Sequence, residues 1–206
     1  MPIFVFFVIF AVWTMYEIKK SNNKGKALSE AFWQRENEAN NVRKQDISNL
    51  DYVEIPYDEL PFDDNAHEPI KSYQDKILSL RDSKILNLTG YTNTDLKMMY
   101  GPANLNNLTE YDNNYITLVS NLGLWIKALN DENHDGNADS IKTLAAYAVS
   151  IGSDVSTTYK ILASIYLEAD MIPEIYDLID KATELNSLNK DVIVTSLRSL
   201  LESDIS

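Results

Sequence analysis

The hydrophobic pattern begins with a nearly unbroken apolar segment at residues 2–18, which reads PIFVFFVIFAVWTMYEI. Large apolar side chains at successive positions leave a helix no polar face to turn toward water, and this is the pattern of a membrane-spanning segment. Its seventeen residues would rise about 25 Å as a helix, near the lower limit for a hydrocarbon core of about 30 Å. The pattern therefore predicts an N-terminal transmembrane helix over residues 2–18.

The residues that flank this segment predict its orientation. Trp13 and Tyr16 lie toward its end, where aromatic rings favour the headgroup layer, and lysines follow at positions 19, 20, 24 and 26. Positively charged flanks stay cytoplasmic, so we expect a single-pass signal anchor with its N-terminus outside and the body of the chain in the cytoplasm. A cleaved secretory signal is the alternative, but it requires basic residues before the apolar segment and small residues after it.

Residues 19–62 are predicted to connect this anchor to a helical body, first through a juxtamembrane helix. Helix formers dominate residues 26–44 and place Leu28, Phe32 and Trp33 on one side of a helix. The aromatic side chains suit either the lipid interface or a packing contact with the body, and the sequence does not separate these alternatives.

The segment at residues 46–62 is predicted to be extended. Pro56 and Pro61 interrupt any helix and favour extended backbone before them. A free linker would not carry so many large apolar side chains, so we expect an ordered strap that crosses the helices. A docking motif for a partner protein is the alternative.

Residues 63–206 are predicted to form a helical domain, so that the fold class is all-α after the N-terminal helix. Apolar residues recur at helical spacing there, and the sequence NDENHDGN at residues 130–137 predicts a turn. The predicted helices cover residues 70–80, 95–100, 115–129, 139–151, 154–169, 173–185 and 190–202.

The C-terminal half repeats its apolar pattern at a constant separation along the chain, which we call the repeat offset. The matched residues form the apolar side of one helix and the turn after it. The aligned pairs are Ile141 with Ile175, Leu144 with Leu178, Ala148 with Ala182, Ile151 with Leu185, and Ser153 with Ser187. The offset is about 34 residues, which is the period of the tetratricopeptide repeat, a stack of helical hairpins.

One unit within residues 111–206 resembles a tetratricopeptide repeat residue by residue. The residues at the family's aromatic, leucine, small and tyrosine positions in the first helix are Tyr159, Leu162, Ala163 and Tyr166. Those at the packing positions of the second helix are Ile175, Ile179 and Ala182. Small residues such as Ala163 let two helix backbones approach closely. The resemblance therefore implies stacked helical hairpins, with an ordinary helical bundle as the alternative.

The sequence also departs from the family pattern. Ile175 replaces a residue that is usually small, and Ser187 stands where proline is common. The preceding unit has Trp125 as its aromatic residue and a connection that we expect to be longer than usual. These departures weaken the match outside the best unit.

The resemblance implies a binding role without catalysis. In tetratricopeptide-like folds the first helices line a groove that binds a protein or peptide. The matching exposed positions, which form the candidate protein-binding groove, are Thr157, Lys160, Ser164, Leu167 and Glu168.

Charge narrows the choice of partner. The chain carries 18 basic and 31 acidic residues, a net charge of −13. Without the four lysines and one glutamate of residues 1–26, 14 basic and 30 acidic residues remain, a net charge of −16. Such a body is repelled by nucleic acid and by anionic lipid, so we expect a basic or neutral protein partner and contact with the bilayer only through the N-terminal helix.

Known chemical motifs are not recognisable in the sequence. The first nine positions of a calcium-binding loop are matched in part, by Asp131, Asn133, Asp135, Gly136 and Asp139. The twelfth position of that loop, which should be a bidentate glutamate, is Lys142. A solvated turn is therefore expected there, with weak calcium binding as the alternative.

The remaining candidates for chemistry are few. His67 and His134 are the only histidines, each in a polar context, and the chain has no cysteine. We therefore expect no catalytic residue, metal or cofactor. The alternatives are a membrane-bound enzyme whose site assembles from distant residues, and an exported helical domain.

Overall fold

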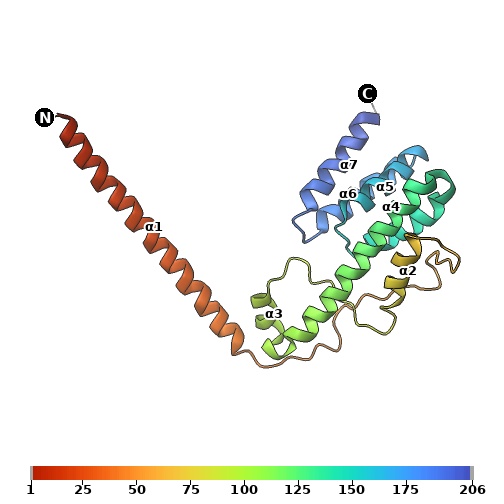
Figure 1. Ribbon diagram of the computed structural model, residues 1–206, viewed down its shortest axis with the longest axis horizontal. Helices are drawn as coiled ribbons and strands as arrows, with labels where there is room; N and C mark the ends of the chain where they lie inside the picture. The colour runs from red at the N-terminus through yellow and green to blue at the C-terminus, as the bar shows by residue number, and fades with distance from the viewer. Residues whose placement is uncertain (1, 205–206) are drawn as a thin grey trace. The chain divides into compact units, whose positions relative to one another are not determined.

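The computed structural model describes residues 2–204 (Figure 1). The side chains of residues 2–5, 9, 11, 12, 22–24, 135 and 203–204 lie outside the described residues. The regular elements of the described chain are all helices, and its only strand-like pairing is an isolated antiparallel bridge between Tyr52 and Leu86. The predicted all-α fold class is therefore confirmed.

The helices agree with most of the predicted segments. Their bounds are α1 Pro2–Asn40, α2 Ile70–Leu78, α3 Asn93–Tyr100, the 3-10 helix η1 Pro102–Asn104, α4 Leu105–Ser150, α5 Ser156–Glu168, α6 Ile172–Glu184 and α7 Lys190–Asp204. The main difference is that α1 is one continuous helix, while the turn predicted within α4 contains a kink at Asn133.

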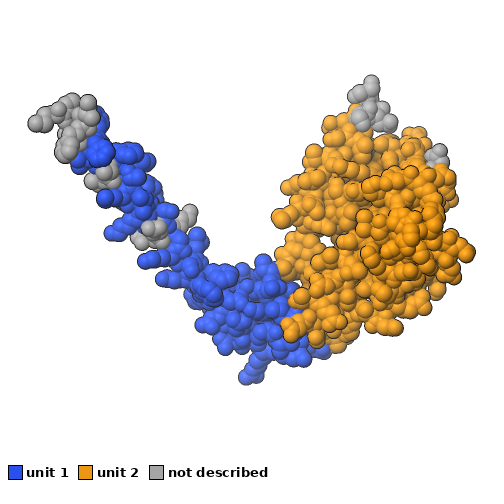
Figure 2. Space-filling model, viewed as in Figure 1, with its two compact units in different colours: residues 1–46, 92–105 blue, residues 47–91, 106–206 orange. Residues whose placement is uncertain are grey.

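The chain divides into two compact units (Figure 2). Unit 1 contains residues 1–46 and 92–105, and unit 2 contains residues 47–91 and 106–206. The predicted segments 2–18, 19–62 and 63–206 divide the chain differently, because the strap belongs to unit 2 and α3 belongs to unit 1.

In unit 1, α1 continues from the apolar segment into a polar helix without a break. Within the described residues, no helix combines the length and the hydropathy needed to cross a membrane. The structure therefore does not support the predicted transmembrane helix at residues 2–18. The apolar segment is only the first part of a 39-residue helix, and several of its side chains (residues 2–5, 9, 11 and 12) lie outside the described residues.

The C-terminal end of α1 is held by α3 through charged contacts. Arg35 Nη2 lies 2.5 Å from Asp95 Oδ1, and Glu36 accepts hydrogen bonds from Thr94, at 2.7 Å, and from Lys97. The hydrogen bond from Lys97 is the main reason that the pKa of Glu36 lies below its ordinary value. These contacts fix α3 beside residues 35–39 of α1, where Ala39 is fully buried.

Gly101 follows the last residue of α3 and has a backbone conformation that residues with a side chain rarely adopt. Its φ is +83°, and a Cβ there would lie 2.6 Å from the carbonyl oxygen of Arg43. We predict that Gly101→Ala costs about 1–3 kcal/mol of stability in unit 1, measured as faster hydrogen exchange of the amides of α3. Gly25→Ala is the matched control, because a Cβ at Gly25 meets no atom within 4 Å. Equal exchange rates in both variants would contradict this packing.

Unit 2 has one hydrophobic core, to which the strap contributes. Residues 47–62 form no helix, and Leu60 is buried in the core while Val53, Ile55 and Phe62 pack against it. The strap is tied to the rest of unit 2 by the amide of Val53, which donates to the carbonyl oxygen of Ile85 at 2.9 Å. Residues 47–62 therefore form an ordered, non-helical strap that packs on the core of unit 2.

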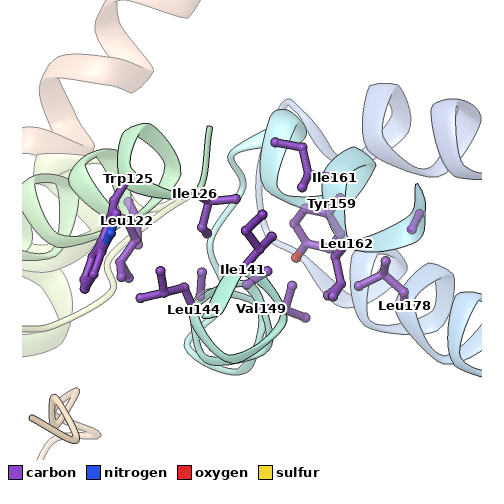
Figure 3. Packing of buried hydrophobic residues seen from close by; sticks show 14 of the residues in the cluster. Leu122, Trp125, Ile126, Ile141, Leu144, Val149, Tyr159, Ile161, Leu162 and Leu178 are labelled. Atoms are coloured by element: carbon purple, nitrogen blue, oxygen red, sulfur yellow. The ribbon is translucent and has the colours of Figure 1, made fainter. Parts of the chain in front are cut away.

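Helix α4 is broken at Asn133, which has an extended backbone with φ −162° and ψ 91°. Each half of α4 contributes its own buried side chains to the core of unit 2 (Figure 3). Trp125 and Ile126 lie on the first half, Ile141 and Leu144 lie on the second, and all four are at most 1% exposed.

Positions related by the repeat offset have matching burial. The second-helix pairs are Ile141 and Ile175, each 0% exposed, Leu144 and Leu178, at 0% and 3%, and Ala148 and Ala182, each 0%. In the first helices, Trp125, Tyr159 and Ile193 are related by the same offset and are 0–1% exposed. Residues that the repeat offset aligns are therefore buried to the same extent in the core.

Buried tyrosines predict alkaline instability of unit 2. Burial is the main cause that raises the pKa of Tyr159 to about 12, and it also raises the pKa of Tyr115 above its ordinary value. Because the folded state then favours the neutral phenol, this stabilisation is complete below pH 10 and is lost as the pH rises toward 12. We expect the free energy of unfolding in urea to fall across that interval.

Tyr159→Phe is the variant that isolates this effect. It removes the hydroxyl that donates to the carbonyl oxygen of Ser153 at 2.9 Å, so it should cost about 1 kcal/mol at neutral pH. The same variant should lose less stability than the wild type between pH 10 and 12. An identical alkaline decline in both proteins would show that this hydroxyl does not titrate with unfolding.

Candidate protein-binding groove

A groove of about 400 Å³ runs between α5 and α7. We call it the α5–α7 groove, and its lining residues are Lys160, Thr195, Ser196, Ser199 and Leu200. The two helices contact each other. The groove therefore lies between two helices that the repeat offset aligns, with Tyr159 on Ile193.

Lys160 is the predicted groove residue that lines this groove. Its side chain is exposed and forms no ion pair within the described part of the chain. An unpaired ammonium beside hydroxyl groups offers a charged donor to a carboxylate or carbonyl oxygen of a bound peptide.

The other predicted residues are not brought together in the groove lining. Thr157 is exposed one turn before Lys160, and Leu167 packs against the core. Ser164 is half-buried, and its Oγ donates to the carbonyl oxygen of Ile161 at 2.8 Å. These side chains are therefore turned toward the solvent, the core and their own helix.

Glu168, the last predicted residue, is engaged elsewhere. Its Oε2 lies 2.9 Å from His134 Nε2, so it links the end of α5 to α4. This contact gives His134 a structural partner, and Nδ1 of the same ring lies 2.6 Å from Asn130 Oδ1. His134 is thus a bridge between helices.

The α7 side of the groove was not identified from the sequence. Ser196 Oγ donates to the carbonyl oxygen of Val192 at 2.8 Å, and Ser199 Oγ donates to that of Thr195 at 2.9 Å. Because each proton is directed at the helix backbone, the hydroxyl oxygens remain able to accept from a ligand. The repeat offset does not reveal them, because it aligns Thr195 and Ser196 with Ile161 and Leu162, which are buried in the core.

The calcium-like sequence lies at the kink of α4, with non-helical backbone at Asn133 and helical backbone on both sides of it. Asp131 pairs with Lys127, and Asn133 Oδ1 accepts the amide of Gly136 at 3.1 Å. The side chain of Asp135 lies outside the described residues. Among the residues searched, no three His, Cys, Asp or Glu side chains gather as they would around a metal ion.

A second candidate surface is the first part of α1. Its large apolar side chains are exposed, with exposed fractions between 43% and 72%. They belong to Phe6, Phe7, Val8, Phe10, Trp13, Met15, Tyr16 and Ile18. Leu28, Phe32 and Trp33 farther along α1 are also exposed.

Comparison with known proteins finds no matching family model, no matching curated protein and no matching solved structure.

Proposed function

We propose that this protein is a membrane-attached, non-enzymatic interaction module. Its N-terminal helix holds the chain at a lipid bilayer, and its tetratricopeptide-like hairpins present the α5–α7 groove to a segment of another protein. The exposure of eight large apolar side chains in the first part of α1 is the observation that carries the proposal.

Membrane attachment is supported by the cost of leaving this surface in water. Burying a Phe, Val, Ile or Met side chain gains about 1.5–3 kcal/mol, so the six residues of these types among the eight together favour an apolar environment strongly. The aromatic side chains Trp13 and Tyr16 come just before Lys19 and Lys20. Aromatic residues followed by lysines suit the boundary between lipid and water.

The orientation that we propose follows from the same lysines. Positive residues beside a membrane segment are retained on the cytoplasmic side, and four of them lie between positions 19 and 26. We place the N-terminus on the outer side and both the groove and the acidic body in the cytoplasm.

The proposed partner is a basic or neutral protein segment. The net charge of −16 after residue 26 attracts a basic chain over distances comparable to the screening length, and salt reduces this attraction. Matching burial at positions related by the repeat offset supports the hairpin architecture on which the groove depends.

Site-specific photo-cross-linking tests the groove. A photoreactive residue at Ser199 should give an adduct with a protein of neutral or positive net charge, identified by mass spectrometry. Lys160→Glu should reduce the yield at least fivefold, and 0.5 M salt should also reduce it. Lys181→Glu is the charge-matched control, since Lys181 is an exposed lysine on α6.

A photoreactive residue at Ser120 controls for nonspecific contact, because Ser120 is exposed on α4. An adduct formed equally from Ser120, or one that is unaffected by Lys160→Glu, would count against the groove as the binding site.

A further inference from the structure

A second cavity of about 260 Å³ lies within unit 2 beneath the end of the strap. We call it the strap pocket. It is lined by residues 61–67, by one face of α2 and by both halves of α4. Its position at the break in α4 brings together side chains that are far apart along the chain, from Pro61 to Ser140.

The inner wall of the strap pocket contains two buried side chains with free hydrogen-bond donors. Gln74 is 2% exposed, and its Oε1 accepts the amide of Asp63 at 3.4 Å. Its Nε2 has no acceptor among the described residues, and neither has the indole N–H of Trp125, which is 1% exposed. Because both side chains line the cavity, these two donors are open to an acceptor that enters it.

The outer wall is acidic. Glu132 and His67 form a contact of 3.2 Å between Oε1 and Nε2, and the exposed side chain of Asp63 also lines the cavity. Glu132 thus faces His67, and Asp63 Oδ1 accepts a hydrogen bond from the amide of Asn65 at 2.8 Å. Carboxylates at the entrance favour a cationic group there.

The size of the cavity limits the ligand to a small molecule. Pockets for drug-sized ligands occupy about 300–1,000 Å³, and the strap pocket lies below that range. Donors on the inner wall and carboxylates at the entrance fit a molecule with an anionic end and a cationic end.

We propose that the strap pocket binds a small zwitterion of the amino-acid class. The ligand carboxylate accepts from Gln74 Nε2 and the Trp125 indole, and its ammonium group faces Asp63 and Glu132. This inference is independent of the proposed membrane and groove functions, because every residue it uses lies in residues 61–67, α2 or α4.

Calorimetric titration of the full chain tests the proposal with glycine, L-alanine, L-serine and L-proline as probes. At least one of them should bind with a Kd below about 1 mM and raise the melting temperature. N-acetylglycine lacks the ammonium group and glycinamide lacks the carboxylate, so each should bind at least tenfold more weakly than the corresponding zwitterion. Absence of binding by all four probes, or equal binding of the two derivatives, would overturn the proposal.

Two variants connect binding to this cavity. Glu132→Gln removes an exposed carboxylate and should weaken binding at least fivefold without changing the melting temperature of the free protein. Glu110→Gln, an exposed glutamate on the first half of α4, is the control and should bind as the wild type does. Gln74→Leu should abolish binding. Unchanged affinity in Glu132→Gln would place the ligand elsewhere, whatever the stability of the Gln74 variant.

Discussion

Replacing Ala163 by glutamate should lower the free energy of unfolding of unit 2 by about 4 kcal/mol or more. Ala163 is 0% exposed on α5, which packs against both α6 and α7. A glutamate there adds volume between close helices and buries a charge without a partner, and both effects are destabilising. The effect should be the largest of any single substitution considered for this chain.

Urea unfolding followed by circular dichroism measures this effect. Ala146→Glu is the matched control, because it introduces the same residue at an exposed position in the second half of α4. That control should stay within about 0.5–1 kcal/mol of the wild type. If both variants unfold at the same urea concentration as the wild type, the close packing of α5 in the hairpins is wrong.

Serine substitution of the apolar residues of α1 should have the largest effect on function. Replacing Phe6, Phe7, Phe10 and Trp13 together should reduce binding to neutral lipid vesicles by at least about a thousandfold. Each residue contributes about 1.5–3 kcal/mol when removed from water, and about 4 kcal/mol is already a factor of a thousand. Vesicle flotation of the full chain measures the loss.

The control variant carries the same number of serines at exposed apolar positions of unit 2. Ile116, Leu124, Tyr176 and Val192 are between 45% and 57% exposed, and their replacement should leave flotation unchanged. Equal loss in both variants would mean that vesicle binding reflects general surface hydrophobicity.

The helices were predictable from the sequence because their apolar residues repeat at helical spacing. Ile175, Leu178 and Ala182 mark the buried side of α6, and Pro173 lies near its first residue. The strap was also predictable in outline, because prolines exclude a helix while residues such as Leu60 need burial.

The turn predicted at residues 130–137 contains the kink at Asn133, where the backbone leaves the helical conformation between the two halves of α4. Trp125 and Ile126 before it and Ile141 after it all enter the core, so the chain keeps helical backbone with a single break at Asn133. The connection from Trp125 to Ile141 has the same length as that from Tyr159 to Ile175. The longer connection expected in this unit is therefore absent.

The sites were less predictable than the helices because their residues are far apart along the chain. Lys160 was identified through the resemblance, but its neighbours Ser196 and Ser199 come from α7. The strap pocket joins Gln74 to Trp125, and no short motif spans that separation. Contacts of this kind depend on tertiary packing, which periodicity alone does not describe.

Fluorescence quenching by brominated lipid tests membrane attachment most directly. Trp13 is one of three tryptophans, and Trp125 is buried in unit 2. In vesicles with bromine near the headgroups, the wild-type emission should be strongly quenched, and Trp13→Phe should remove most of that quenching while the chain still floats with the vesicles. Emission that is equally quenched with and without Trp13, or not quenched in either protein, would contradict attachment through the first part of α1.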